Sequence, residues 1–200
     1  MSAVKLILAS GSPRRREILS AAGAVFDVIT SDADEKLPAG TNPADAVVIL
    51  ASRKASAVYN SRPDFSGEDV FVLGSDTVVD IDGRILGKPR DKDEARSMIS
   101  AISGGSHLVH TGICVIHNGI SSGISETTRV SVDSLTPEEI EAYIESGEPY
   151  DKAGGYAIQG LFSKYIAGIR GDYYNVMGLP VRALERLLKS SFGVSLRDFT

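Results

Sequence analysis

The sequence predicts an α/β fold in which a mixed β-sheet is covered by helices. Strand and helix patterns alternate over the first half of the chain, which favours strands joined by helices. Asn118-Gly119 then separates two long predicted strands, and this dipeptide is typical of a tight antiparallel hairpin. A length of 200 residues and a hydrophobic content of 42% suit one sizeable core. We expect one domain over residues 1–200, with two lobes around a cleft and a frayed tail from about residue 190.

The first elements are a strand, a loop and a helix. Val4–Ala9 is a short apolar segment with β-branched residues, which predicts a strand. Ser12 is a good N-cap residue and Pro13 suits the first helical position, so a helix should begin here and end before Gly23. Val25–Thr30 has the composition of a second strand.

The next segment contains a long helix and an interrupted strand. Asn42-Pro43 predicts the start of a helix that runs to about Tyr59, and Ser61–Asp69 reads as a loop. Two apolar strands should then follow, separated by the polar residues Gly74-Ser75-Asp76. They are predicted at Val70–Leu73 and Thr77–Ile81.

Strong turn and cap signals define the middle of the chain. Asp82-Gly83 predicts a hairpin turn, and Asp91 with Glu94 predicts an acidic cap for a helix that ends near Gly104. The two long strands flanking Asn118-Gly119 follow. Their predicted ranges are Ser106–Ile116 and Ile120–Val132.

The last third of the chain is more irregular. Thr136 with Glu139 forms a capping-box pattern that predicts a helix to about Ser146. The glycine-rich segment Gly147–Gly160 predicts a loop. A strand at Leu161–Ile169 and an amphipathic helix at Val181–Leu188 complete the expected fold.

Charge and hydropathy exclude several classes of protein. A net charge of -5 argues against a general nucleic-acid binder, which needs a broad positive surface. The N-terminal apolar segment is too short for a signal sequence or a membrane span. We therefore expect a cytoplasmic protein that binds neither nucleic acid nor membrane.

The chain offers few nitrogen or sulfur ligands for a metal. Its single cysteine, Cys114, lies in an apolar segment and is expected to be a buried, inert thiol. His107 and His110 are three residues apart on a predicted strand and should therefore face opposite sides of the sheet. No zinc site is expected.

A compact anion site is predicted where the first strand meets the first helix. Ser10 and Ser12 place hydroxyls and backbone N–H groups there, and Arg14 and Arg15 add guanidiniums that match phosphate oxygens. Three consecutive arginines oppose the dipole at a helix N-terminus, and a bound anion would remove that cost. The alternative is a solvated basic turn with an ordinary serine cap.

One carboxylate and two lysines are further candidates. Asp76 interrupts an apolar strand, where a charge is unfavourable without partners, and such a group can hold a metal ion or accept a proton from water. The alternative is an ordinary strand end. Lys54 within a helix and Lys88 beyond a strand are more often surface charges and gain interest only as part of a set.

Short motifs, in matching order over nearly the whole chain, resemble those of the Maf family. They are Ala9–Arg15, Ser75–Thr77, Gly87–Pro89, Ser146–Gly154, Ile158–Gly160 and Asn175–Pro180. The resemblance runs from about Leu6 to about Leu188, and motifs in register are far more specific together than any one alone.

This resemblance implies an elongated α/β architecture, with a mixed sheet flanked by helices and a cleft between two lobes, related to the inosine triphosphate pyrophosphatase fold. It implies hydrolysis of nucleoside triphosphates to the monophosphate and pyrophosphate. The implied cofactor is a divalent cation, Mg²⁺ or Mn²⁺. The expected partner is the triphosphate substrate, and a homodimer is compatible with the resemblance.

The resemblance also assigns roles to individual residues. Asp76 corresponds to the catalytic carboxylate, and it would ligate the metal, deprotonate water, or do both in succession. Glu35 resembles an acidic position that helps to hold the metal. The residues that resemble the triphosphate-binding set are Ser10, Arg14, Arg15, Lys54 and Lys88.

Asp151–Gly160 is similar to the branch of the family that acts on dTTP and UTP, rather than the branch that prefers 7-methyl-GTP. In the pyrimidine branch, Arg14, Thr77 and Gln159 occupy the positions associated with base choice. A glutamine amide presents both a donor and an acceptor and can therefore pair with the uracil edge.

Two other functions share these residues. One is a non-enzymatic nucleotide-binding regulator of cell division or septum formation, and the other is a phosphatase that releases orthophosphate. Asp76 beside a complete basic set favours an enzyme, because binding alone requires no exposed base. Product analysis separates the three functions.

Overall fold

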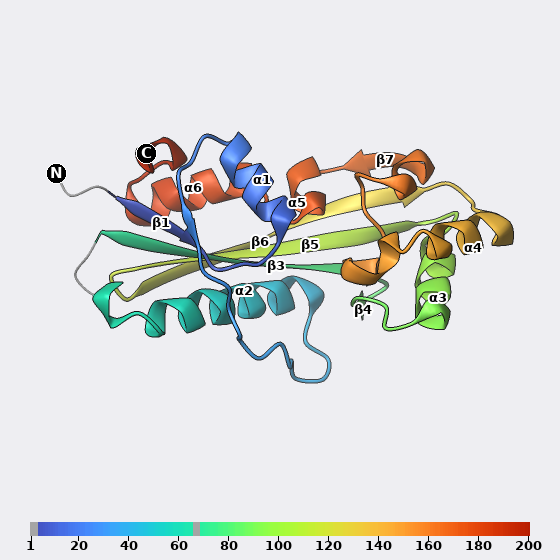
Figure 1. The fold of residues 1–200 in the computed structure, drawn as a ribbon, viewed down its shortest axis with the longest axis horizontal. Coiled ribbons are helices and arrows are strands. Elements are labelled where there is room, and N and C mark those ends of the chain that lie inside the picture. The colour runs from blue at the N-terminus through green and yellow to red at the C-terminus, as the bar shows by residue number, and fades with distance from the viewer. Residues whose placement is uncertain (1–3, 66–68) are drawn as a thin grey trace.

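The computed structural model describes residues 4–65 and 69–200, which form one elongated mixed sheet with helices on both faces (Figure 1). In the described residues, the seven strands are ordered β2-β1-β3-β5-β6-β7, and β4 also pairs with β3. β1 is parallel to β2 and β3, and the other pairs are antiparallel. The strands are β1 (Lys5–Leu8), β2 (Asp27–Val28), β3 (Val70–Ile81), β4 (Arg84–Leu86), β5 (Ser106–His117), β6 (Ile120–Val132) and β7 (Ile166–Arg170). The predicted mixed α/β fold is confirmed.

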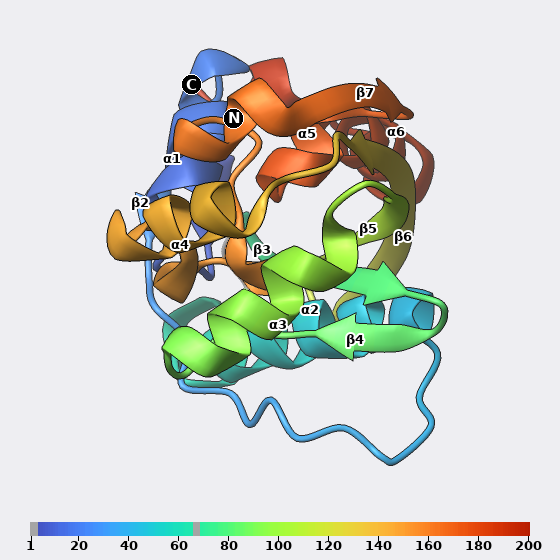
Figure 2. The same cartoon turned by 90° about the vertical axis from the view of Figure 1, so that its right-hand side faces the viewer.

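Helices cover both faces of the sheet, and two further helices lie at one end of it. They are α1 (Pro13–Ala21), α2 (Pro43–Asn60), α3 (Lys92–Ile102), α4 (Pro137–Glu145), α5 (Tyr173–Met177) and α6 (Val181–Phe192). α2 covers one face, and α1, α5 and α6 cover the other (Figure 1). α3 and α4 lie at the far end of the long strands, toward the viewer in Figure 2. No helix in the described ranges is long and apolar enough to cross a membrane.

Apolar side chains gather in three clusters around this sheet. One lies under α1 and α6 and includes Leu8 and Leu184, and a second lies under α2 and includes Ala51. The third includes Ile99 and Val130 and fills the far end, beneath α3 and α4. The long strands β3, β5 and β6 are therefore the elements that connect the two ends of the molecule.

β3 is one continuous strand, so the prediction of two strands separated by Gly74-Ser75-Asp76 is wrong. Each residue of this stretch pairs with β5, and Asp76 lies opposite Gly112. The polar residues do not interrupt the strand because their backbone groups have a partner. On the outer side, β1 pairs with β3 only as far as Leu73, and β4 begins to pair at Val79. Residues 74–78 therefore form an unpaired stretch of sheet edge within the described chain.

Both predicted hairpin turns are confirmed. Asp82 and Gly83 have φ values of 50° and 83°, and Asn118 and Gly119 have φ values of 47° and 76°. Positive φ at both central residues is what a two-residue turn of this hand requires. The Asp82-Gly83 turn aims β4 back along β3 and so delivers Lys88 beside the unpaired edge.

Helix starts follow the predicted caps at several positions. The side chain of Asn42 accepts a hydrogen bond from the N–H of Ala44, and Thr136 with Glu139 forms the complete capping box. Asp91 also caps α3, although the carboxylate of Glu94 accepts from the N–H of Arg90 rather than from Asp91.

Two predicted strands are shorter than expected. The segment at Val25–Thr30 forms only the two-residue strand β2. Leu161–Tyr165 is a 3₁₀ turn, and only Ile166–Arg170 is strand. Phe162 and Tyr165 are both buried in the far-end cluster, and a 3₁₀ turn places residues three apart on one side. The short helix α5 was not predicted.

The C-terminal tail is ordered against the core, so the predicted fraying is wrong. α6 continues to Phe192, and Phe199 is completely buried in the cluster under α1 and α6. The carbonyl of Phe199 also accepts a hydrogen bond from the N–H of Val25 at 2.9 Å. Apolar burial thus outweighs the flexibility expected of a chain end.

Candidate active site

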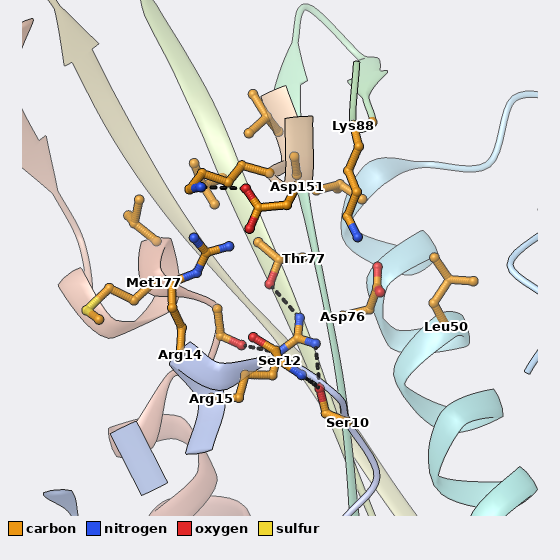
Figure 3. Close-up of a pocket in the computed structure, with 18 of the residues that line it drawn as sticks. Ser10, Ser12, Arg14, Arg15, Leu50, Asp76, Thr77, Lys88, Asp151 and Met177 are labelled. Carbon is orange, nitrogen blue, oxygen red and sulfur yellow. Dashed lines mark hydrogen bonds and ion pairs between the residues drawn. The ribbon is translucent and has the colours of Figure 1, made fainter. Parts of the chain in front are cut away.

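A cleft of about 910 Å³ opens at the unpaired edge of β3 (Figure 3). It is bordered by the loop between β1 and α1, by α2, by the exit of β4, by the segment before β7 and by the C-terminal end of α5. All of the predicted site residues line it. They are Ser10, Arg14, Arg15, Glu35, Lys54, Asp76, Thr77, Lys88 and Gln159.

Asp76 and Thr77 divide the cleft because successive strand residues point to opposite faces of a sheet. Asp76 faces α2, where Lys54 meets it. Thr77 faces the opposite side and meets Arg15 of α1. The cleft therefore presents an acidic group on one face of β3 and a hydroxyl on the other.

Lys54 binds two carboxylates at once. Its ammonium lies 2.5 Å from Asp76 Oδ1 and 2.7 Å from Glu35 Oε1. Asp76 and Lys54 are largely buried, whereas 65% of the Glu35 side chain is exposed. The hydrogen bond from Lys54 lowers the pKa of Glu35, although partial burial acts in the opposite direction. The predicted base and the predicted second acid are thus held by one cation.

Close packing of α2 on the sheet makes this contact with Lys54 geometrically attainable. A Cβ atom on Gly74 would lie 2.1 Å from the carbonyl oxygen of Ala51, and one on Gly112 would lie 2.2 Å from that of Val47. Only glycine permits such an approach of backbone to backbone. The two glycines let α2 sit low enough for Lys54 to reach Asp76.

Arg15 is fixed by three hydrogen bonds. Nε donates to the carbonyl of Gly178 at 2.8 Å, and the terminal nitrogens donate to Ser10 Oγ at 3.2 Å and to Thr77 Oγ1 at 3.1 Å. Ser75 Oγ also donates to Gly178 O, at 3.1 Å. A guanidinium carries five N–H groups, so two remain for a ligand in the cleft. Burial lowers the pKa of Arg15 and the charge of Asp76 opposes this, but arginine stays protonated.

Ser12 is not the side-chain cap that the sequence predicted. It occupies the N-cap position of α1, but its hydroxyl makes no capping hydrogen bond. Instead, its backbone N–H donates to Ser10 Oγ at 3.2 Å. Because the Ser12 hydroxyl accepts no hydrogen bond from the first turn of α1, the backbone N–H groups of that turn remain available to an anion at the edge of the cleft.

Arg14, Lys88 and Gln159 lie around the mouth of the cleft. Figure 3 shows the ammonium of Lys88 directed into the cleft toward Asp76, and Arg14 next to Asp151. Burial acts to raise the pKa of Asp151, but the hydrogen bond from Lys152 and the charge of Arg14 hold it below its ordinary value. Gln159 is exposed at the rim. These side chains retain freedom to meet a ligand.

Glu148 is a supporting residue to which the sequence analysis assigned no role. Its carboxylate accepts hydrogen bonds from the hydroxyl of Tyr143 at 3.1 Å and from the N–H of Leu161 at 2.9 Å. Lys152 donates to its backbone carbonyl at 2.9 Å. Gly160 packs so closely that a Cβ atom there would lie 2.6 Å from the carboxylate. Glu148 thus fixes the loop that carries Gln159. Its place in the motif Ser146–Gly154 was the sign in the sequence that could have identified it.

The histidines serve the fold rather than the cleft. His107 Nε2 is 2.6 Å from the hydroxyl of Tyr156, and burial lowers the pKa of His107 to about 4. His110 lies on the opposite face, 3.2 Å from Asp80 and 2.9 Å from Thr127. The predicted opposite orientation of the two histidines is confirmed. Within residues 4–65 and 69–200, no three His, Cys, Asp or Glu side chains gather where they could hold a metal ion.

The chain is similar to proteins of one sequence family. A profile of the family described as "Maf-like protein" matches residues 5–191. A protein named dTTP/UTP pyrophosphatase from Bacillus anthracis is 48% identical over 185 residues, which cover 92% of this chain and 94% of that protein. Its namesake from Bacillus cereus is 46% identical over the same shares. Among solved structures, the Staphylococcus aureus Ham1 protein aligns over 98% of this chain and 93% of its own, with 10% identity and a TM-score of 0.45.

Proposed function

This chain belongs to the Maf family, and from that premise we propose that its cleft hydrolyses nucleoside triphosphates, dTTP and UTP foremost, to the monophosphate and pyrophosphate. Relatives named for this activity are 46% and 48% identical over nearly the whole chain. The residues that the motifs single out line one cleft, which is consistent with a single site for triphosphate and water.

Asp76 is the observation on which the enzymatic function rests. It is a largely buried carboxylate at the wall of a cleft that also contains Arg14, Arg15, Lys54 and Lys88. A carboxylate repels the phosphate oxygens unless it binds a metal ion or a proton, and both of these roles belong to phosphoanhydride hydrolysis. We therefore assign Asp76 as the base for the attacking water and as a ligand of the metal.

The basic residues suit the charge of a triphosphate. Arg15 offers two N–H groups from a fixed position, Ser10 adds a hydroxyl, and α1 adds its N-terminal dipole. Lys88 and Arg14 approach from the mouth of the cleft (Figure 3). Catalysis of phosphoryl transfer is largely positioning and charge stabilisation, which is what this set supplies.

A divalent cation would be held by Asp76 and Glu35. Each carboxylate contacts the Lys54 ammonium through one oxygen, so the second oxygen of Asp76 and the second oxygen of Glu35 could serve as ligands. Mg²⁺ commonly binds through one or two carboxylates together with substrate phosphates and water, which this pair fits without a third protein ligand. The bound cation, Mg²⁺ or Mn²⁺, would supply charge stabilisation to the phosphate oxygens.

In the reaction that we propose, Asp76 accepts a proton from water. The water oxygen forms a bond to the α-phosphorus, and the bond from that phosphorus to the bridging oxygen of the β-phosphate breaks. Pyrophosphate leaves with the electron pair, so triphosphate and water give monophosphate, pyrophosphate and a proton. Arg15 and Lys88 stabilise the charge that develops on the phosphate oxygens.

The nucleobase would lie toward Gln159 and Thr77, and Arg14 would lie between the nucleobase and the phosphates. Gln159 has an exposed amide at the rim, and the cleft wall beyond Thr77 includes Val109 and Tyr156. An apolar wall with a few polar groups suits a nucleobase.

We further propose that the chain forms one domain and that it acts in the cytoplasm, where nucleotide substrates are found.

The experiment is product analysis on the purified chain with Mg²⁺. Incubation with UTP or dTTP should yield UMP or dTMP and pyrophosphate in equal amounts, separated by ion-exchange chromatography. Chelation by EDTA should abolish turnover, and excess Mg²⁺ or Mn²⁺ should restore it. Orthophosphate as the first product would instead indicate a phosphatase. Binding without any product would indicate a nucleotide-binding regulator.

A further inference from the structure

The hydroxyl of Thr77 lies between two polar groups. Arg15 donates to Thr77 Oγ1 at 3.1 Å, and the hydroxyl of Thr111 on β5 lies 3.0 Å from the same atom. A threonine hydroxyl can donate one hydrogen bond and accept two. The direction of the bond between the two threonines therefore decides whether Thr77 has a hydrogen left for a ligand.

Asn175 settles that direction. Its backbone carbonyl lies 2.8 Å from Thr111 Oγ1, and a carbonyl oxygen can only accept. The single hydrogen of Thr111 therefore points to Asn175. It follows that Thr111 accepts from Thr77, and that the only hydrogen of Thr77 is committed to Thr111.

The carbonyl of Asn175 is held in place by its own side chain. Nδ2 donates to the carbonyl of Val109 and to Thr128 Oγ1, both at 2.9 Å. Asn175 and Thr111 are both fully buried, and Thr111 does not line the cleft. The order of hydrogen bonds is therefore built into the contact of α5 with β5 and β6.

Ser10 has the opposite hydrogen-bond character. Its Oγ accepts from the N–H of Ser12 and from Arg15, which uses both acceptor positions. Its hydrogen remains available to a phosphate oxygen. Thr77, by contrast, can only accept, and the oxygens of an ionised triphosphate carry no hydrogen to give it. The cleft thus has a donor hydroxyl and an acceptor hydroxyl on either side of Arg15.

We propose that Thr111 is a positioning residue that fixes Thr77 as an obligate acceptor, so that the nucleoside end of the substrate must donate a hydrogen bond to Thr77. This inference rests on the proposed function. UTP and dTTP share two such donors, the N3–H of the base and the 3′-hydroxyl of the sugar. CTP lacks the first, and 3′-deoxy-UTP lacks the second.

The test compares kcat/KM for UTP with that for each analogue in the wild type and in variants. In the wild type, kcat/KM should be about tenfold or more lower for the analogue that lacks the group donating to Thr77, because the Thr77 hydroxyl is then left without its donor. Thr111→Val frees the hydroxyl of Thr77 to turn and donate, so this preference should fall at least fivefold. Thr111→Ser keeps the hydroxyl and should restore the preference. Thr127→Val, on the opposite face of the sheet, is the matched control and should behave as wild type.

Thr77→Val provides a second arm if Thr111→Val does not fold, and it should also lose the preference. Equal use of UTP and both analogues by the wild type would overturn the inference, as would a preference that survives Thr77→Val or Thr111→Val. A Thr111→Ser variant that behaves like Thr111→Val would overturn it too. Failure of the wild type to release pyrophosphate from UTP would instead contradict the proposed function, so the two failures are distinguishable.

Discussion

Lys54 is the residue that joins the acidic groups of the cleft. It approaches from α2 and contacts Asp76 on β3 and Glu35 in the preceding loop. An ion pair that is partly withdrawn from water is screened less than one on the surface. The ammonium therefore sets the electrostatic environment of both carboxylates, and its removal should change each of them.

Replacement of Lys54 by Met should raise the pKa of Glu35. The pKa is low because Lys54 donates a hydrogen bond to this carboxylate, so it should return toward the ordinary value of about 4.3. The Lys54–Glu35 pair stabilises the fold when the pH is above the ordinary pKa of glutamate. This stabilisation is lost as the pH falls through the lowered pKa of Glu35 in the folded protein. Carbon-13 NMR titration of Glu35 measures the change. Lys36→Met, in the same loop, is the control, and an unchanged titration in Lys54→Met would contradict the assigned contact.

Asp76→Asn should lower kcat by about 10²- to 10⁴-fold, the range typical of a lost general base, while triphosphate binding stays measurable. The amide keeps the shape of the side chain but removes the charge that accepts a proton. Steady-state kinetics with isothermal titration calorimetry separates the two effects. Asp82→Asn provides a control in a turn that favours asparagine. Turnover of Asp76→Asn within threefold of the wild type would refute the role of Asp76.

Among the elements, α2 has the tightest fit to the sheet. It crosses β3 and β5 at the two positions where a side chain would collide with its backbone, Gly74 and Gly112. Helix-on-sheet packing normally separates the two backbones by a layer of side chains, and this helix omits that layer locally. The position of Asp76 relative to Lys54 thus depends on two glycines that carry no functional group.

Gly74→Ala should destabilise the protein by about 1–3 kcal/mol, the usual cost of overpacking, and should also lower kcat. The added Cβ would lie 2.1 Å from a backbone oxygen of α2, so the helix must move away and carry Lys54 from Asp76. Urea denaturation and UTP turnover measure the two effects. Gly168→Ala on β7 meets nothing within 4 Å and is the control. Equal stability of the two variants would show that α2 adjusts freely.

At the scale of the whole molecule, the C-terminal tail is part of the core that also contains β1. Phe199 inserts beneath α1 and α6, and its carbonyl accepts a hydrogen bond from the N–H of Val25. The tail is therefore bonded to the segment between α1 and β2. The cluster that the tail completes also supports β1, whose end carries Ser10. A change at the last turn of the chain can therefore reach the loop between β1 and α1 through packing.

Phe199→Ala should destabilise the fold by about 3–5 kcal/mol, as expected for a large aromatic side chain removed from a filled core. A frayed tail would instead tolerate the change with almost no effect. Thermal unfolding monitored by circular dichroism distinguishes these outcomes. Thr200→Ala, at an exposed neighbour, should leave the melting temperature unchanged.

Local signals carried most of the predicted fold, and tertiary contacts explain what was missed. The Asn118-Gly119 turn and the Thr136 cap depend on neighbouring residues only, so the sequence alone predicts them. The burial of Phe199 depends on distant elements. The same division holds in the cleft, where motifs predicted Asp76 and its basic partners. Thr111 lies in a strand whose neighbouring residues give no sign of its hydrogen-bonding role.

The unpaired edge of β3 also has a consequence for amide hydrogen exchange. A strand inside a sheet protects its amides on both sides, but between Leu73 and Val79 only the β5 side of β3 has a neighbouring strand. Amides that point into the cleft should therefore exchange with deuterium faster than those bonded to β5, although both belong to one strand. A bound nucleotide would close this side and slow the first group alone. Deuterium uptake along residues 74–78 of β3 should thus alternate in the free protein and become uniform when the cleft is filled.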